Sequence, residues 1–151
     1  MSTDKDILEE FFQKLENKLR ERLPRATGKT VDSLEHKVQN DGGQLLAASW
    51  IGALEYGRGP RKSSQDQGMW RHIQEWLAVK GMDASESNAK RLTWWINMHG
   101  TSLFQSGKPS EVISGVINEQ AIDNLSSKLG DYYAVSFVSE VLKDLKILKV
   151  I

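Results

Sequence analysis

The sequence predicts an α+β domain with an amphipathic N-terminal helix, one β-hairpin at about residues 34–50 and several packed helices. Three observations predict it. Apolar residues recur every three or four positions near the N-terminus, strict alternation flanks a Gly-Gly turn, and helical spacing returns over most of the remaining chain. At 151 residues, we expect a single domain over 1–151, large enough to bury a core without disulfides.

The first helix is predicted over residues 3–23. Thr3 and Asp6 have the spacing of a capping box, and Pro24 marks the end of the helix. The apolar positions form one stripe, which we expect to face the core: Ile7, Leu8, Phe11, Phe12, Leu15, Leu19 and Leu23.

Residues 27–60 contain the only secure β-structure. A short turn or helix opens at Gly28, alternation from Leu34 indicates a strand, and Asp41-Gly42-Gly43 forms the turn to a return strand over 44–50. The segment 51–56 suits a short helix, which the glycines and proline of 57–60 end. Residues 59–68 hold no large apolar side chain and are predicted to be an exposed loop.

Helices are predicted for most of the rest. A helix pair occupies 66–100, with helices over 67–80 and from Asp83 to about His99, each followed by a glycine. A turn-rich loop follows, and the C-terminal helices and an apolar tail occupy 109–151, with a break at Gly130. The tail has two interpretations: it folds back onto the body, or it pairs as a C-terminal strand with a neighbouring subunit's sheet.

Composition excludes several classes of protein. Twenty Lys+Arg balance twenty Asp+Glu, so the net charge is zero, which argues against non-specific coating of DNA. With no cysteine, disulfides, thiol catalysis and zinc–thiolate or iron–sulfur sites are excluded. No apolar run is long enough to span a membrane, and the acidic start MSTDKDILEE is unlike a signal peptide.

Five Trp are unusual; each is expected in the core by default, although Trp94 points away from its helix's apolar face.

No residue pattern indicates a catalytic centre. The three histidines lack metal-ligand spacing, and Gly28-Lys29-Thr30 lacks the first glycine of a phosphate-binding loop. Glu55 is the one carboxylate with two interpretations: it is buried and bonded to Arg58, Arg61 or an arginine of another subunit, or it is solvated at a helix end. We therefore expect no enzyme activity, no metal and no cofactor.

Residues 27–104 carry a series of short motifs, which begins with Thr27-Gly28-Lys29 before a helix ending at Ser33-Leu34 and continues with the hairpin and the segment Ala53-Leu54-Glu55-Tyr56-Gly57-Arg58-Gly59-Pro60. In this order the motifs resemble those of the neck and tail-completion proteins of tailed bacteriophages. The helix from Trp70 to Gly81 and the turn Met98-His99-Gly100-Thr101 also resemble family members. Arg58 stands where the family has threonine, and the chain after residue 107 departs from the family pattern.

The resemblance implies a structural protein of the virion neck or tail, assembled in the host cytoplasm as a homo-oligomeric ring. Its implied partners are portal, connector or tail proteins, with genomic DNA at most passing through the lumen and no membrane. Residues 59–68 would contact the next ring or a neighbouring subunit. The expected interface and architectural residues are Gly28, Glu55, Tyr56, Gly57, Arg58, Gly59, Pro60, Arg61, Lys62, Trp94, Ile147, Leu148, Val150 and Ile151.

A nucleic-acid-binding adaptor is the alternative, and it depends on a basic stretch over residues 14–29. This stretch contains Lys14, Lys18, Arg20, Arg22, Arg25 and Lys29. Lysine and arginine at such density can neutralise phosphates, and the aromatic residues could stack on bases. A solvated helix face is the simpler interpretation of the same residues, and no known DNA-reading motif accompanies them.

Overall fold

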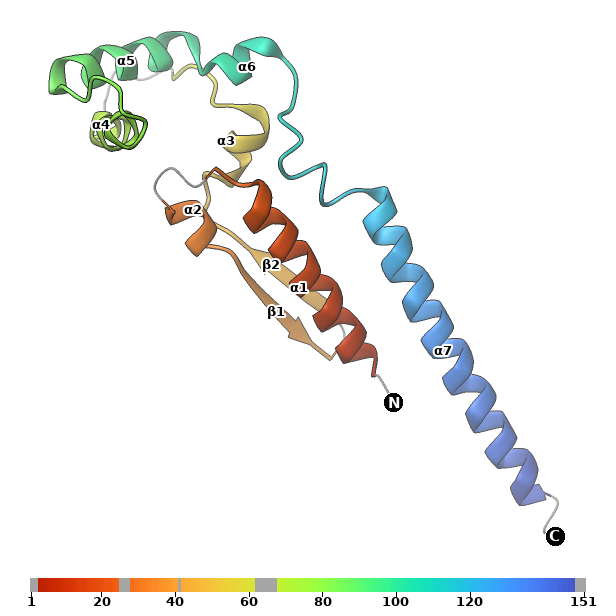
Figure 1. Cartoon of the computed structure of the whole chain (residues 1–151). Helices are drawn as coiled ribbons and strands as arrows, with labels where there is room; N and C mark the ends of the chain where they lie inside the picture. Colours follow the sequence, from red (N-terminus) through yellow and green to blue (C-terminus); the bar gives the residue numbers. More distant parts are fainter. Residues whose placement is uncertain (1–2, 25–27, 41, 62–67, 149–151) are drawn as a thin grey trace.

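The first helix, α1 (Asp4–Arg22), lies between the β-hairpin on one side and the last helix, α7 (Glu119–Leu148), on the other (Figure 1). The computed structural model describes residues 3–24, 28–40, 42–61 and 68–148. The main core gathers around the second half of α1 and consists of Leu15, Leu19, Leu23, Leu34 and Val116. The α+β class predicted from the sequence is confirmed.

The amphipathic character of α1 and its capping box are both confirmed. The Thr3 hydroxyl accepts from the Asp6 N–H at 3.2 Å, and the Asp6 carboxylate accepts from the Thr3 N–H at 2.7 Å. Leu8, Leu15 and Leu19 of the predicted stripe are buried. The helix ends at Arg22, two residues before the proline that was predicted to stop it.

The hairpin is confirmed, but it is shorter than predicted. Strands β1 (Glu35–Gln39) and β2 (Gly42–Leu46) pair antiparallel, with Glu35 opposite Leu46 and Gln39 opposite Gly42. The two glycines predicted as the turn therefore begin the return strand, which ends at Leu46 and not at residue 50. The Phe12 ring of α1 lies against Gly43 and leaves no room for a Cβ there, so α1 sits directly on the strand.

Short helices join the hairpin to the rest of the chain. Helix α2 (Lys29–Asp32) precedes β1, and α3 (Ile51–Tyr56) follows β2. Gly28 and Gly57 flank them with φ of 76° and 77°, a left-handed conformation that only glycine adopts cheaply. Both positions are glycines on which the family resemblance rests.

The predicted helix pair is present as α4 (Met69–Val79) and α5 (Glu86–His99), which pack against each other. Helix α5 starts three residues later than the predicted Asp83, because Ser85 caps it: the Ser85 hydroxyl accepts from the Asn88 N–H. The loop predicted after Gly100 contains a short helix, α6 (Ser102–Ser106), capped by Thr101.

The C-terminal region differs most from the prediction. Residues 112–117 form turns, and α7 then runs unbroken through Gly130, where we predicted a break. A C-terminal strand is also contradicted as far as Leu148, because the backbone is helical to that residue. A single glycine costs a helix only about 1 kcal/mol relative to alanine, too little to interrupt a helix that contacts α1 on both sides of it, through Lys128 and Tyr133.

Leu19→Ala tests the core. Leu19 is 1% exposed, so its truncation should lower the free energy of unfolding by about 2–5 kcal/mol in urea denaturation. The control is Leu46→Ala, the same substitution at a side chain that is 37% exposed, where the loss should be well under half as large. Equal losses would contradict this location of the core.

Candidate interaction surfaces

Glu55 is a buried carboxylate, as one of its two interpretations predicted. It is 2% exposed on α3. The Ile113 N–H donates to it at 2.8 Å and the Ser114 N–H at 3.3 Å, and the Ser114 hydroxyl donates to the same carboxylate. The Arg58 guanidinium donates instead to the Asn97 side-chain oxygen on α5 at 3.0 Å. Within the chain, main-chain N–H groups and Ser114 therefore bond Glu55 in place of the predicted Arg58 or Arg61.

These hydrogen bonds fix the charge state of Glu55 and the path of the chain. Burial alone would raise its pKa, but the donors at Ser114 and Ile113 outweigh burial and hold the pKa below the ordinary value for Glu. Ser110 adds two bonds to α3, from its N–H to the Glu55 carbonyl and from its hydroxyl to the Leu54 carbonyl. The turns before α7 are thus fastened to α3.

The Gly57-Arg58-Gly59 segment is packed against α6. The Arg58 N–H donates to the Thr101 hydroxyl at 2.9 Å, and the Thr101 N–H donates to the Arg58 carbonyl at 2.8 Å. A Cβ at Gly57 would collide with the Phe104 backbone, and one at Gly59 would lie 3.1 Å from the Phe104 ring. Both glycines therefore let the segment lie close to Phe104, and Gly57 also adopts a positive φ.

The other predicted site residues fall into three groups. Gly28 caps α2 with its left-handed backbone. Tyr56, Pro60, Arg61 and Trp94 are exposed. Lys62, Val150 and Ile151 lie outside the described residues, as do the side chains of Ile147 and Leu148.

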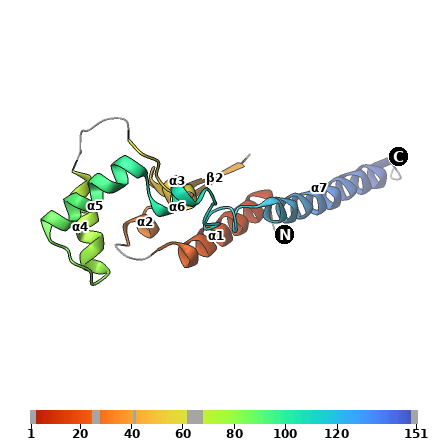
Figure 2. The ribbon, with the colours of Figure 1, turned by 90° about the horizontal axis from the view of Figure 1, so that it is seen from above.

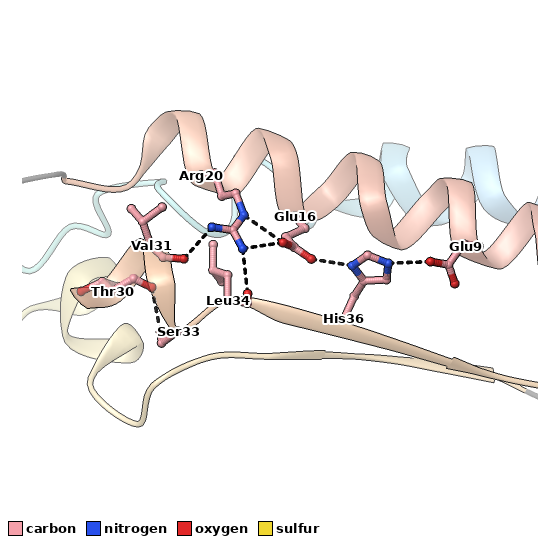
Figure 3. Close-up of polar contacts among 8 residues, drawn as sticks. All are labelled: Glu9, Glu16, Arg20, Thr30, Val31, Ser33, Leu34 and His36. Atoms are coloured by element: carbon pink, nitrogen blue, oxygen red, sulfur yellow. Dashed lines mark hydrogen bonds and ion pairs between the residues drawn. The ribbon is translucent and has the colours of Figure 1, made fainter. Parts of the chain in front are cut away.

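A chain of polar contacts joins α1 to the hairpin (Figure 3). His36 on β1 contacts Glu16 through Nδ1 at 2.5 Å and Glu9 through Nε2 at 2.8 Å, and Arg20 pairs with Glu16 at 2.6 Å. Arg20 also donates to the carbonyls of Val31 and Leu34, both at 2.9 Å. The carboxylates of Glu16 and Glu9 raise the pKa of His36 above its ordinary value.

This polar chain was not predicted from the sequence, although the spacing of its two carboxylates along α1 indicates it. Glu9 and Glu16 are seven residues apart, two helical turns, so they lie on one face of α1. A histidine at an inward strand position opposite that face is the partner that could have identified them.

Most of the tryptophans are at the surface, which overturns the expected core position of Trp50, Trp76 and Trp95, whereas Trp94 was predicted to point away from the apolar face of its helix. Trp50, Trp76, Trp94 and Trp95 are between 37% and 59% exposed. Trp94, Trp95 and Met98 project from α5, and we call them the α5 surface; the His99 ring stacks on Trp95 at 3.9 Å. Trp50 and Trp76 line a groove of about 380 Å³ with His72 and the Lys29–Glu75 ion pair.

A second uncovered apolar surface lies on the C-terminal half of α7. Its members are between 39% and 67% exposed, and we call them the α7 surface: Val135, Phe137, Val138, Val141 and Leu142. In Figures 1 and 2 this part of α7 extends past the start of α1, at the far end of the molecule from α5. The structure therefore separates two apolar surfaces in space.

The basic stretch is largely engaged within the chain. Arg20 pairs with Glu16, Lys29 pairs with Glu75 at 2.8 Å, and Arg22 donates to the Glu111 carbonyl at 3.1 Å. Arg25 lies outside the described residues. Lys14 and Lys18 line a small groove between α1 and α7.

Neither a metal site nor a membrane-spanning helix is found among the described residues. They contain no group of three or more His, Cys, Asp or Glu placed to hold a metal ion. Within the same part of the chain, no helix is both long and apolar enough to cross a bilayer. Comparison with family models, with curated proteins and with solved structures returns no match for this chain.

Glu55→Gln should lower the free energy of unfolding at pH 7 by about 1–3 kcal/mol, because the amide nitrogen cannot accept the bonds that the carboxylate accepts. The pKa of Glu55 is lowered in the fold, so its stabilisation is present above the unfolded value of 4.5 and is lost as pH falls through the folded value. The gap between variant and wild type should therefore narrow in acid. Glu21→Gln, at an exposed position of α1, is the control and should show no gap.

His36→Gln should remove a pH dependence of stability. Because the folded pKa of His36 is raised, its stabilisation is fully present below the unfolded value of 6.5 and is lost as pH rises through the folded value. Unfolding free energies measured from about pH 6 to pH 9 should fall in the wild type and stay flatter in the variant. His72→Gln, which alters an exposed histidine of α4, should keep the wild-type slope; a flat wild-type profile would contradict the assignment.

Proposed function

We propose that this protein is a structural subunit of the head–tail joint of a tailed bacteriophage, assembled with copies of itself into a ring between portal and tail. It acts in the virion and catalyses no reaction. Its partners are further copies of this chain and the portal, connector or tail proteins on either side. Genomic DNA at most passes through the lumen of the ring.

The observation that carries the proposal is the pair of separated apolar surfaces on one small domain. A folded monomer does not gain from leaving Trp94 and Trp95 half exposed at one end and Phe137 at the other. A connector needs one surface for its own copies and another for the protein next to it. The α5 and α7 surfaces supply two such places, well apart on the molecule (Figure 1).

The corner formed by α3, the Gly57-Arg58-Gly59 segment and the turns before α7 supports the same function. The glycine-rich segment after Tyr56, on which the family resemblance rests, is packed on Thr101 and Phe104. Glu55 itself fastens the chain that leads into α7. One rigid corner therefore sets the direction of both the α5 and the α7 surfaces, as an assembly subunit requires.

The nucleic-acid-binding alternative has weaker support. Of the basic residues on which it depends, Arg20, Arg22 and Lys29 already contact groups within the chain. Binding phosphates would require these contacts to be given up, which reduces the gain from counterion release. A DNA affinity that falls steeply with salt would favour this alternative over the ring.

The test is the joining of heads to tails. In a lysate that lacks this protein, filled heads and free tails should accumulate separately, and adding the purified chain should join them, as counted by electron microscopy. Trp94→Ser should reduce joining at least tenfold, whereas Arg91→Ser, at an exposed polar position on the same helix, should not. Complete particles formed without the protein would overturn the proposal.

A further inference from the structure

Lys14 and Lys18 are two basic residues of α1 to which the proposed function gives no role. Both are exposed, and they lie one helical turn apart on the same side of the helix. Within the described part of the chain, neither lysine takes part in an ion pair. Their charges are therefore available to a ligand from outside the chain.

Both lysines border a cavity of about 100 Å³ between α1 and α7, which we call the α1–α7 groove. The apolar residues that line it are Phe11, Leu15, Ala121 and Leu125. Phe11 and Ala121 also pack against the main core, which holds this lining in place. Because a cavity of about 150 Å³ accommodates benzene, the groove has room for a single aliphatic side chain.

The rim of the α1–α7 groove carries more positive than negative charge. Lys14 and Lys18 line it from α1 and Lys128 from α7, whereas Glu10 is the carboxylate in the lining and pairs with Lys128 at 2.8 Å. Glu21 lies further along α1 and lines only a depression on α1 itself. The two lysines without a salt bridge therefore leave a net positive charge beside an apolar cavity. A complementary ligand carries carboxylates next to an aliphatic side chain.

The length of the α1–α7 groove fits a helical peptide. From Glu10 to Lys18 it extends for about 12 Å, or about two helical turns, at 1.5 Å per residue. An amphipathic helix can lie along this length with its aliphatic residues toward the cavity and its acidic residues toward the lysines. Nucleic acid is less complementary, because its phosphates would pair with the lysines but would leave the apolar cavity unfilled.

We propose that the α1–α7 groove docks an acidic amphipathic helix of a partner protein, with an aliphatic side chain in the cavity and carboxylates against Lys14 and Lys18. This inference goes beyond the proposed function and does not rest on it. The positive rim would select an acidic partner and steer its approach, so binding should weaken as salt is added.

The test measures the binding of fluorescently labelled helical peptides to the purified chain by anisotropy. The probe is three repeats of ELAALEQ, which place leucine on one face of a helix and glutamate on both sides of that face. Two control peptides change one property each: KLAALKQ repeats reverse the charge, and EAAAAEQ repeats remove the aliphatic side chains. The probe should bind, and each control peptide should bind at least tenfold more weakly.

A pair of variants in α7 locates the binding site. Asn124→Glu places a carboxylate in the lining of the groove and should weaken binding of the acidic probe at least fivefold. Ser126→Glu adds the same charge at an exposed position about 200° away around α7 and should leave binding unchanged. Circular dichroism checks that both variants keep the helix content of the wild type.

A pair of double variants tests the two lysines. Lys14→Gln combined with Lys18→Gln should weaken binding of the acidic probe at least fivefold. Lys5→Gln combined with Lys37→Gln removes the same charge at exposed positions outside the groove lining and should leave binding unchanged.

Three results would overturn the inference: an acidic probe that does not bind, equal binding of the acidic and basic peptides, or an affinity that Asn124→Glu leaves unchanged. A fourth is a DNA duplex that binds more tightly than the acidic probe and depends on Lys14 and Lys18, which would favour the nucleic-acid-binding alternative. The mixtures contain no heads or tails, so any of the first three results leaves the proposed function standing.

Discussion

The two-sided packing of α1 is the constraint on which the rest of the structure depends. One side of this helix covers the hairpin, where Phe12 fits over the bare backbone of Gly43, and another side receives the first half of α7. The buried leucines between them form the main core. Because the core is small and central, the α4–α5 pair and the end of α7 extend from it with much of their apolar surface uncovered (Figure 2).

Two groups of polar contacts hold these elements in place, and they differ in how deeply their charged side chains are buried. The contacts of Glu9, Glu16 and Arg20 around His36 set α1 against β1 through partly exposed charges. Glu55 instead works from within, as a buried carboxylate satisfied by main-chain N–H groups from a segment almost sixty residues away. The contacts of His36 weaken as pH rises through its raised pKa, whereas those of Glu55 weaken as pH falls through its lowered pKa, so the two groups of contacts respond to opposite changes in pH.

The sequence predicts local structure well where one residue type permits few alternatives. Thr3 with Asp6, the glycines at 28, 57 and 100, and the alternation from Leu34 all locate an element correctly. Prediction fails where the outcome depends on distant contacts: the donors to Glu55 come from a turn with no pattern of its own. Gly130 was given too much weight as a helix breaker, and Trp50, Trp76 and Trp95 were expected in a core that a single domain of this shape does not provide.

Gly130 gives α7 a built-in weak point. It lies three residues before Tyr133, which bonds to Asp4 at the start of α1, and a Cβ at position 130 would meet open space, so no packing requires the glycine. The end of α7 that carries the α7 surface extends past the start of α1, so it can bend at low cost while the body stays folded. A neighbour that covered the α7 surface in the proposed assembly would also stiffen this end, and the entropy lost in ordering it would offset part of the binding free energy.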